Sequence, residues 1–131
     1  MKLMRSAHAK HIDYGFLHSV DPNSPNFVPS DIDGVVERNG VFLFTEWKRP
    51  LEDMKAGQEK MLISLAKKPD VFVVRVTGEQ SESMTHIYGF EVIRNGRWIA
   101  EGESLIDFYG FYKRWLNYAT NKNEQTTKRT V

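Results

Sequence analysis

The chain has 131 residues, a formal net charge of +1 and no cysteine, and 40% of its residues are hydrophobic. This length and composition predict one soluble globular domain. The lack of cysteine excludes a disulfide scaffold, a cysteine-ligated zinc site and a thiol nucleophile. No apolar run approaches the roughly 20 residues that span a bilayer, and the first residues have no signal-peptide pattern, so we expect a cytoplasmic protein that does not bind membranes.

The first thirty residues predict a helix followed by a loop. Apolar residues recur at a loosely helical spacing over residues 2–18. His8, His11 and Asp13 lie close together there, but no cysteine completes a zinc set, so we favour polar surface over a metal cluster. Residues 20–29 contain three prolines, which excludes a helix and a central strand.

Residues 30–49, SDIDGVVERNGVFLFTEWKR, predict a β-hairpin that turns at Asn39-Gly40. A two-residue turn would fix which residues of the two strands face each other. Side chains alternate between the two faces of a sheet, so one face would carry four such pairs. The pairs are Glu37 with Phe42, Val35 with Phe44, Asp33 with Glu46, and Asp31 with Lys48.

The inner half of this face is unfavourable for folding alone. Like charges directly opposite each other destabilise a sheet, and Asp33 faces Glu46. A divalent cation binds oxygen ligands and would turn this repulsion into attraction. Lys48 lies on the same face, two residues beyond Glu46, so the pattern predicts a site for metal-assisted hydrolysis of a phosphate ester.

A helix and a buried strand are predicted next. Glu52 and Asp53 carry the charge that the start of a helix prefers, and the helix is expected over residues 52–67. Gln58 interrupts its apolar stripe, either as a residue at the edge of the core or as a side chain that reaches back to the carboxylates. The run VFVVRVT, residues 71–77, is typical of a strand buried on both faces and paired in parallel.

The remaining chain predicts a second hairpin, a last helix and a tail. Residues 85–94 and 97–100 flank a second Asn-Gly turn, without an acid cluster. Residues 104–119 have an aromatic stripe at helical spacing, which favours core packing over stacking on bases. We expect one domain over residues 1–119 and a flexible basic tail over residues 120–131. Together the elements predict an α/β fold, a mixed central β-sheet flanked by helices.

The pattern of Asp33, then Glu46-Trp47-Lys48, then Gly57-Gln58, resembles the PD-(D/E)xK nuclease superfamily. Within it, the spacing is similar to Holliday-junction resolvases and VRR-type nucleases. The resemblance covers residues 30–76 and implies a restriction-endonuclease-like core with the order α-β-β-β-α-β.

The resemblance also implies roles for individual residues. Asp33, Glu46 and the backbone carbonyl of Trp47 would bind Mg²⁺ or Mn²⁺, Lys48 would orient the attacking water, and Gln58 would be an additional catalytic residue. Two departures are visible. The family often has a glutamate on its first helix, and no glutamate precedes Glu37. Asp31 also competes for the first acid position, as a further metal ligand or as a brace for Lys48.

The function implied is a metal-dependent nuclease that hydrolyses DNA phosphodiester bonds. A domain of this size offers little surface for base-specific readout, so we expect a structure-selective or nonspecific endonuclease. Its partners would be DNA, with branched and single-stranded forms included, and a second copy in a homodimer; in a bacterium or phage it would be nucleoid-associated. The alternative is a catalytically inactive nucleic-acid-binding or interaction module on the same fold.

Overall fold

The computed structural model describes residues 12–24 and 26–130, with side chains up to residue 122. The chain forms two compact units, Met1–Asp31 and Ile32–Val131. In the first unit, the 3₁₀ helix η1 spans Tyr14–Leu17, and the Asp13 carboxylate accepts a hydrogen bond from the Gly15 amide at 2.8 Å. The predicted helix over residues 2–18 is therefore reduced to one short 3₁₀ turn in its described part; His8 and His11 lie outside the described residues.

The second unit is built on a five-stranded sheet whose spatial order follows the chain order. Its strands are β1 (Gly34–Arg38), β2 (Val41–Lys48), β3 (Val71–Gln80), β4 (Thr85–Arg94) and β5 (Arg97–Gly102). Only β2 and β3 pair in parallel; the other neighbours are antiparallel. This mixed sheet confirms the predicted α/β class and the parallel partnership of β2 and β3.

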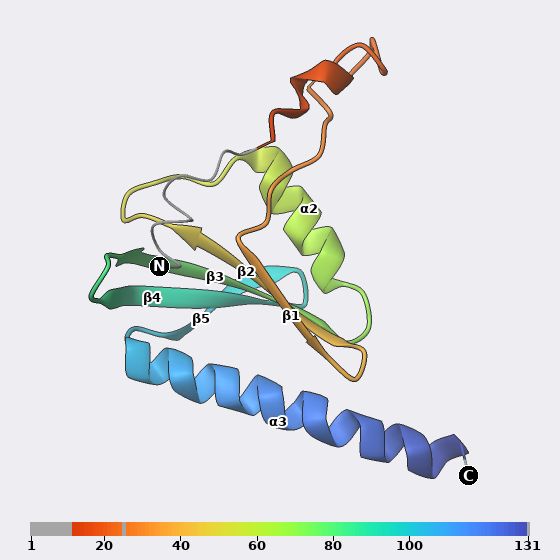
Figure 1. Cartoon of the computed structure of the whole chain (residues 1–131), viewed down its shortest axis with the longest axis vertical. Helices are drawn as coiled ribbons and strands as arrows, with labels where there is room; N and C mark the ends of the chain where they lie inside the picture. The colour runs from red at the N-terminus through yellow and green to blue at the C-terminus, as the bar shows by residue number, and fades with distance from the viewer. Residues whose placement is uncertain (1–11, 25, 131) are drawn as a thin grey trace. The chain divides into compact units, whose positions relative to one another are not determined.

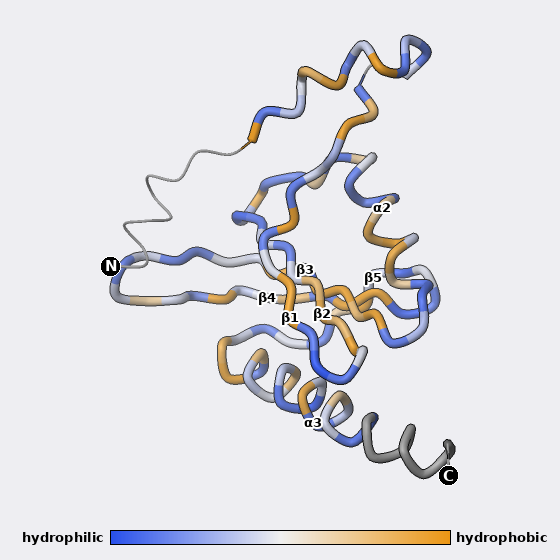
Figure 2. Tube along the Cα trace, turned by 45° about the vertical axis from the view of Figure 1, so that its right-hand side comes forward, coloured by the Kyte–Doolittle hydropathy of each residue, from blue (hydrophilic) through white to orange (hydrophobic). Residues whose placement is uncertain are grey.

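Two helices cover opposite faces of this sheet: α2 (Ala56–Ala66) lies on one face and α3 (Leu105–Thr130) on the other (Figure 1). The α3 side holds the larger core cluster, in which Leu43 and Val76 meet Trp115. On the α2 side Leu62 packs against Val73 and Ile93. The apolar strand residues therefore lie between two helical layers, as the hydropathy colouring also shows (Figure 2).

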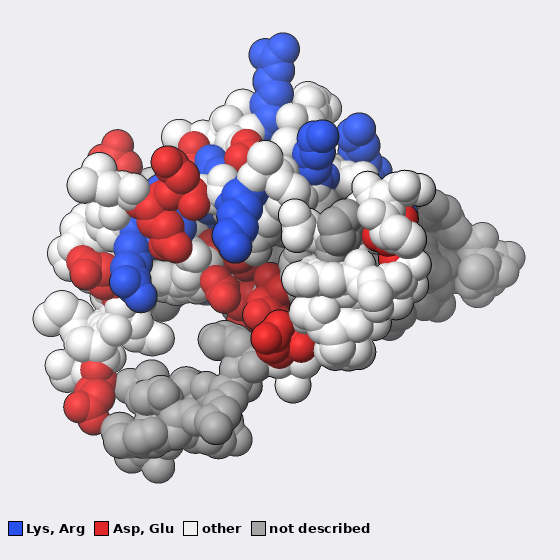
Figure 3. All heavy atoms as spheres, turned by 90° about the horizontal axis from the view of Figure 1, so that it is seen from above, with Lys and Arg blue, Asp and Glu red and all other residues white. Residues whose placement is uncertain are grey.

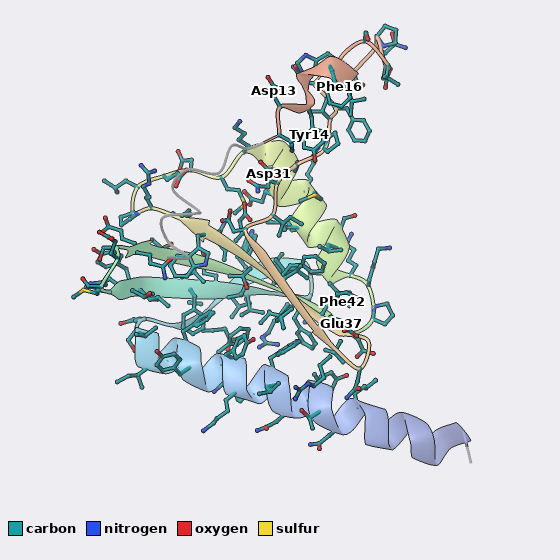
Figure 4. The ribbon with its side chains drawn as sticks, in the orientation of Figure 1. Asp13, Tyr14, Phe16, Asp31, Glu37 and Phe42 are labelled. Carbon is teal, nitrogen blue, oxygen red and sulfur yellow. The ribbon has the colours of Figure 1, made fainter. Side chains whose placement is uncertain are left out.

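Both predicted Asn-Gly turns form as expected. Asn39 and Asn95 each have φ of 53°, and Gly40 and Gly96 have φ of 83° and 77°. These are the left-handed conformations that a two-residue hairpin turn requires. The predicted register follows, with Glu37 opposite Phe42 and their side chains close together at the turn end of the hairpin (Figure 4).

Several predicted boundaries are wrong. Two strands, not three, precede α2 in the described residues, so their order is β-β-α-β-β-β-α. The helix predicted from residue 52 begins at Ala56, because a turn with Leu51 at φ of 67° precedes Glu52 and residues 52–55 form no regular structure. β3 continues to Gln80, beyond the strand predicted over residues 71–77, and α3 continues to Thr130 through the segment predicted as a flexible tail. No helix in the described residues is long and apolar enough to cross a membrane.

Candidate active site

The candidate site lies on the α2 face of the sheet, at the ends of β1 and β2 away from their turn. The ladder of the hairpin ends at Gly34 opposite Thr45, and Asp33 and Glu46 are the next residues outward. The Asp33 amide donates a hydrogen bond to Glu46 Oε1 at 3.1 Å. The predicted opposition of the two acids is thus retained one residue beyond the ladder.

Each of the two carboxylates accepts a hydrogen bond from a backbone amide. Asp33 Oδ2 accepts a hydrogen bond from the Trp47 amide at 2.7 Å. In an antiparallel pair a residue's N–H and C=O point to the same neighbouring strand. The Trp47 carbonyl therefore points toward the strand edge where Asp33 lies, as its predicted role as a ligand requires.

Glu46 is a buried acid, with 7% of its surface exposed. Its second oxygen, Oε2, accepts a hydrogen bond from Gln58 Nε2 on α2. Of the two interpretations of Gln58, this contact supports the one in which its amide reaches the carboxylates. Burial removes water from the Glu46 carboxylate, and the hydrogen bonds from the Asp33 amide and from Gln58 replace part of that hydration.

Lys48 is half-buried and is held by the turn that follows β2. Its Nζ donates to the Glu52 carbonyl at 3.0 Å. In the same turn the Arg49 amide donates to Glu52 Oε1 at 2.8 Å, and the Glu52 amide donates to the Arg49 carbonyl. Glu52 was predicted to start a helix; instead it forms the turn that holds the lysine.

Asp31 belongs to the N-terminal unit, on the exposed stretch that leads toward β1 (Figure 4). The structure therefore does not place it relative to Lys48. Its roles as a ligand or as a brace for Lys48 remain predictions.

A charged residue that the sequence analysis did not select stands beside the acids. Arg75 on β3 is the register partner of Glu46. Its Nη2 lies 2.7 Å from Glu91 Oε1, and its guanidinium lies 3.9 Å from the centre of the Trp98 ring. Arg75 is the single charged residue in VFVVRVT, and this is the signal by which the sequence could have revealed it. Its pairing with Glu46 places the two residues on the same face of the sheet. Acidic and basic side chains intermingle on this side of the molecule (Figure 3).

The donor set fits a hard divalent cation held weakly. Two carboxylates and one backbone carbonyl are oxygen ligands, and Mg²⁺ binds through one or two carboxylates while it keeps several waters. No group of three or more His, Cys, Asp or Glu side chains arranged to hold a metal occurs among the described residues. The protein would thus supply fewer ligands than a dedicated metal cage.

Comparison with known proteins found no matching family model, no matching curated protein and no matching solved structure.

Proposed function

We propose that this chain is a metal-dependent nuclease that hydrolyses phosphodiester bonds in DNA. The observation that carries the proposal is the buried Glu46, held by the Asp33 amide and by Gln58, with Lys48 two residues further along the same strand face. Folding alone does not favour an acid buried beside another acid, so the arrangement is better explained by a cation that binds both. The finer fold assignment, a restriction-endonuclease-like core, is part of this proposal, with two strands in place of three before α2 in the described residues.

Each residue has a separate task. Asp33, Glu46 and the Trp47 carbonyl would hold Mg²⁺ or Mn²⁺, which when bound supplies an activated water and neutralises charge on the phosphate. Gln58 keeps the Glu46 carboxylate oriented. Lys48, anchored by the Glu52 carbonyl, presents a fixed positive charge near the reacting phosphate, and such a group contributes about 3 kcal/mol to lowering the barrier.

One observation favours a second candidate function. The described residues offer two acidic side chains at the site and no group of three. A catalytically inactive nucleic-acid-binding or interaction module on the same fold would also be compatible with this smaller ligand set. Cleavage assays separate the two candidates.

The test is incubation of the pure protein with plasmid, linear, branched and single-stranded DNA and with RNA, in Mg²⁺, Mn²⁺ or EDTA. We expect cleavage in metal and none in EDTA. Glu46→Gln and Lys48→Ala should each lower the rate about 10²- to 10³-fold. Glu82→Gln and Lys60→Ala are the matched controls, because both side chains are exposed and lie outside the site.

Thermal unfolding of each variant completes the experiment. Unfolding midpoints close to that of the wild type would show that lost activity is not lost folding. Binding without any cleavage in metal would reject the enzyme and support the inactive module. Unfolding of both site variants would make the cluster a structural network.

A further inference from the structure

A second group of polar and aromatic side chains lies at the far end of β3 and β4. Tyr88 Oη donates a hydrogen bond to Glu79 Oε2 at 2.7 Å. The rings of Tyr88 and His86 stack with centroids 4.3 Å apart and an interplanar angle of 26°. Both residues are exposed, Tyr88 to 46%. We call Glu79, His86 and Tyr88 the aromatic platform.

A β-bulge builds this platform. Thr77 pairs with Gly89, but the next residue, Gly78, pairs with Ile87, so Tyr88 is the extra residue. A bulge redirects a side chain, and here Tyr88 lies beside His86. Gly78 permits the close approach of the strands, because a Cβ there would lie 2.5 Å from the His86 carbonyl oxygen.

The aromatic platform shares a sheet face with the candidate active site. Glu46 pairs with Arg75 and Lys48 pairs with Thr77. Side chains alternate along β3, so Arg75, Thr77 and Glu79 point to the same face. At a rise of about 3.3 Å per residue, Glu79 lies roughly 7 Å beyond the Lys48 row and roughly 13 Å beyond the Glu46 row.

This spacing suits a nucleic acid strand. Successive nucleotides rise about 3.4 Å along one strand of a duplex, so roughly 7 to 13 Å corresponds to two to four nucleotides. Exposed aromatic rings bind unpaired bases by stacking, whatever the sequence. A carboxylate such as that of Glu79 can accept a hydrogen bond from a base amino group, whereas it repels a phosphate. The platform therefore suits a base and not the backbone.

We propose that the aromatic platform binds an unpaired nucleobase two to four nucleotides from the phosphate that is cleaved. The inference rests on the proposed nuclease function and names its substrate class. A base inside a continuous duplex has both faces covered by its neighbours. The preferred substrate is therefore a strand with a single-stranded segment next to the cleaved bond, such as an overhang, a flap or the branch of a junction.

The test measures binding of the full-length protein to a fluorescent DNA duplex that has a single-stranded overhang and to the same duplex with blunt ends. Ca²⁺ replaces Mg²⁺, and EDTA is a second condition. Tyr88→Ala and His86→Ala should each weaken binding of the overhang DNA about tenfold and leave binding of the blunt duplex unchanged. Tyr109→Ala is the matched control, because Tyr109 is 64% exposed on α3, on the opposite face of the sheet.

A second readout reports stacking directly. The fluorescent base 2-aminopurine, placed in the overhang, should be quenched by the wild type and by Tyr88→Phe, which keeps the ring. It should stay bright with Tyr88→Ala. If Tyr88→Ala does not fold, as thermal unfolding would show, His86→Ala and Tyr88→Phe still test the platform.

The outcomes separate this inference from the proposed function. If both alanine variants cleave DNA and bind overhang DNA as the wild type does, the platform is rejected and the proposed nuclease function is unaffected. Equal losses on overhang and blunt DNA would also reject it, because an unpaired base would then not be the ligand. A wild type that neither binds nor cleaves any nucleic acid would overturn the proposed function and, with it, the platform.

Discussion

Glu46 receives a hydrogen bond on each of its carboxylate oxygens, from the residue that precedes β1 on one side and from α2 on the other. The Asp33 amide contacts Oε1 and Gln58 Nε2 contacts Oε2. Both donors favour the ionised carboxylate over the neutral acid. The carboxylate is therefore held in one orientation by two independent elements before any ligand arrives.

The Gln58 contact gives the first prediction. Gln58→Ala removes the donor that orients Glu46, and loss of such a supporting group costs about 10- to 100-fold in metal affinity or activity. We expect the Mn²⁺ concentration needed for half-maximal binding to rise by that factor, measured by calorimetric titration. Gln80→Ala, the same change on β3 beyond the site, should leave the affinity unchanged. Equal Mn²⁺ affinities of Gln58→Ala and Gln80→Ala would show that Gln58 does not support the metal site.

At the scale of residues, the sequence predicts the contacts that depend only on which residues of a hairpin face each other. The opposition of Asp33 and Glu46 follows from a two-residue turn and alternation, both of which are properties of neighbouring residues. The hydrogen bond between Lys48 and the Glu52 carbonyl cannot be predicted in this way, because it depends on a turn where Leu51 adopts a positive φ. The stacking of Arg75 on Trp98 joins β3 to β5 and depends on the assembled sheet.

At the scale of elements, the first hairpin is fastened to α3 through its turn. Asn39 Nδ2 donates to the Ala119 carbonyl at 3.0 Å, and Arg38 Nη1 donates to Thr120 Oγ1 at 3.2 Å. β1 is the edge strand that leads from Asp33. These contacts therefore hold the strand that directly follows Asp33, one of the two acids.

The two Asn-Gly turns allow this contact to be measured. Asn39→Ala and Asn95→Ala carry the same cost of about 1 kcal/mol for placing alanine at positive φ. Only Asn39 also bonds to α3 within the described chain, so Asn39→Ala should destabilise by about 0.5–1.5 kcal/mol more. Urea unfolding of the two variants gives the difference. Equal destabilisation would mean that the bond to Ala119 contributes nothing.

The bulge between β3 and β4 gives a prediction with an internal control. A Cβ at Gly78 would lie 2.5 Å from a backbone oxygen, so Gly78→Ala should destabilise by about 1–3 kcal/mol as the strands separate. Gly57 in α2 has nothing within 4 Å of an added Cβ, and Gly57→Ala should stabilise by up to about 1 kcal/mol. Thermal unfolding should show opposite shifts of the midpoint. A stable Gly78→Ala variant would contradict the close strand approach.

The elements that the sequence predicts well are those with local signals. Both hairpins, the parallel β3 and the existence of α2 and α3 follow from turn dipeptides and apolar periodicity. The ends do not. β3 runs on to Gln80 because it pairs with β4 beyond the bulge, and a polar sequence such as that after Gly78 has no pattern that reveals this partner.

At the scale of the whole molecule, metal binding and folding are linked. A cation that binds only the folded chain stabilises it, by about 1.4 kcal/mol at ten times its dissociation constant. For a chain of this length we expect Mn²⁺ to raise the unfolding midpoint by about 5 °C. Glu46→Gln should abolish this shift and Glu82→Gln should retain it. An unchanged wild-type midpoint at high millimolar Mn²⁺ would argue against a metal site, independently of any cleavage assay.

The order of the strands has a kinetic consequence. Since the sheet order follows the chain, three of its four strand pairings are hairpins that close locally, and only β2 with β3 requires residues 49–70 to loop back. Closing that loop costs chain entropy before its contacts form, so we expect it to be the slow step of folding. Asp33 and Glu46 belong to the β1–β2 end of the sheet, and the stacked rings of His86 and Tyr88 lie on β4, across the β2–β3 pairing. The surface that combines the candidate active site with the aromatic platform therefore forms only when the crossover between β2 and β3 closes.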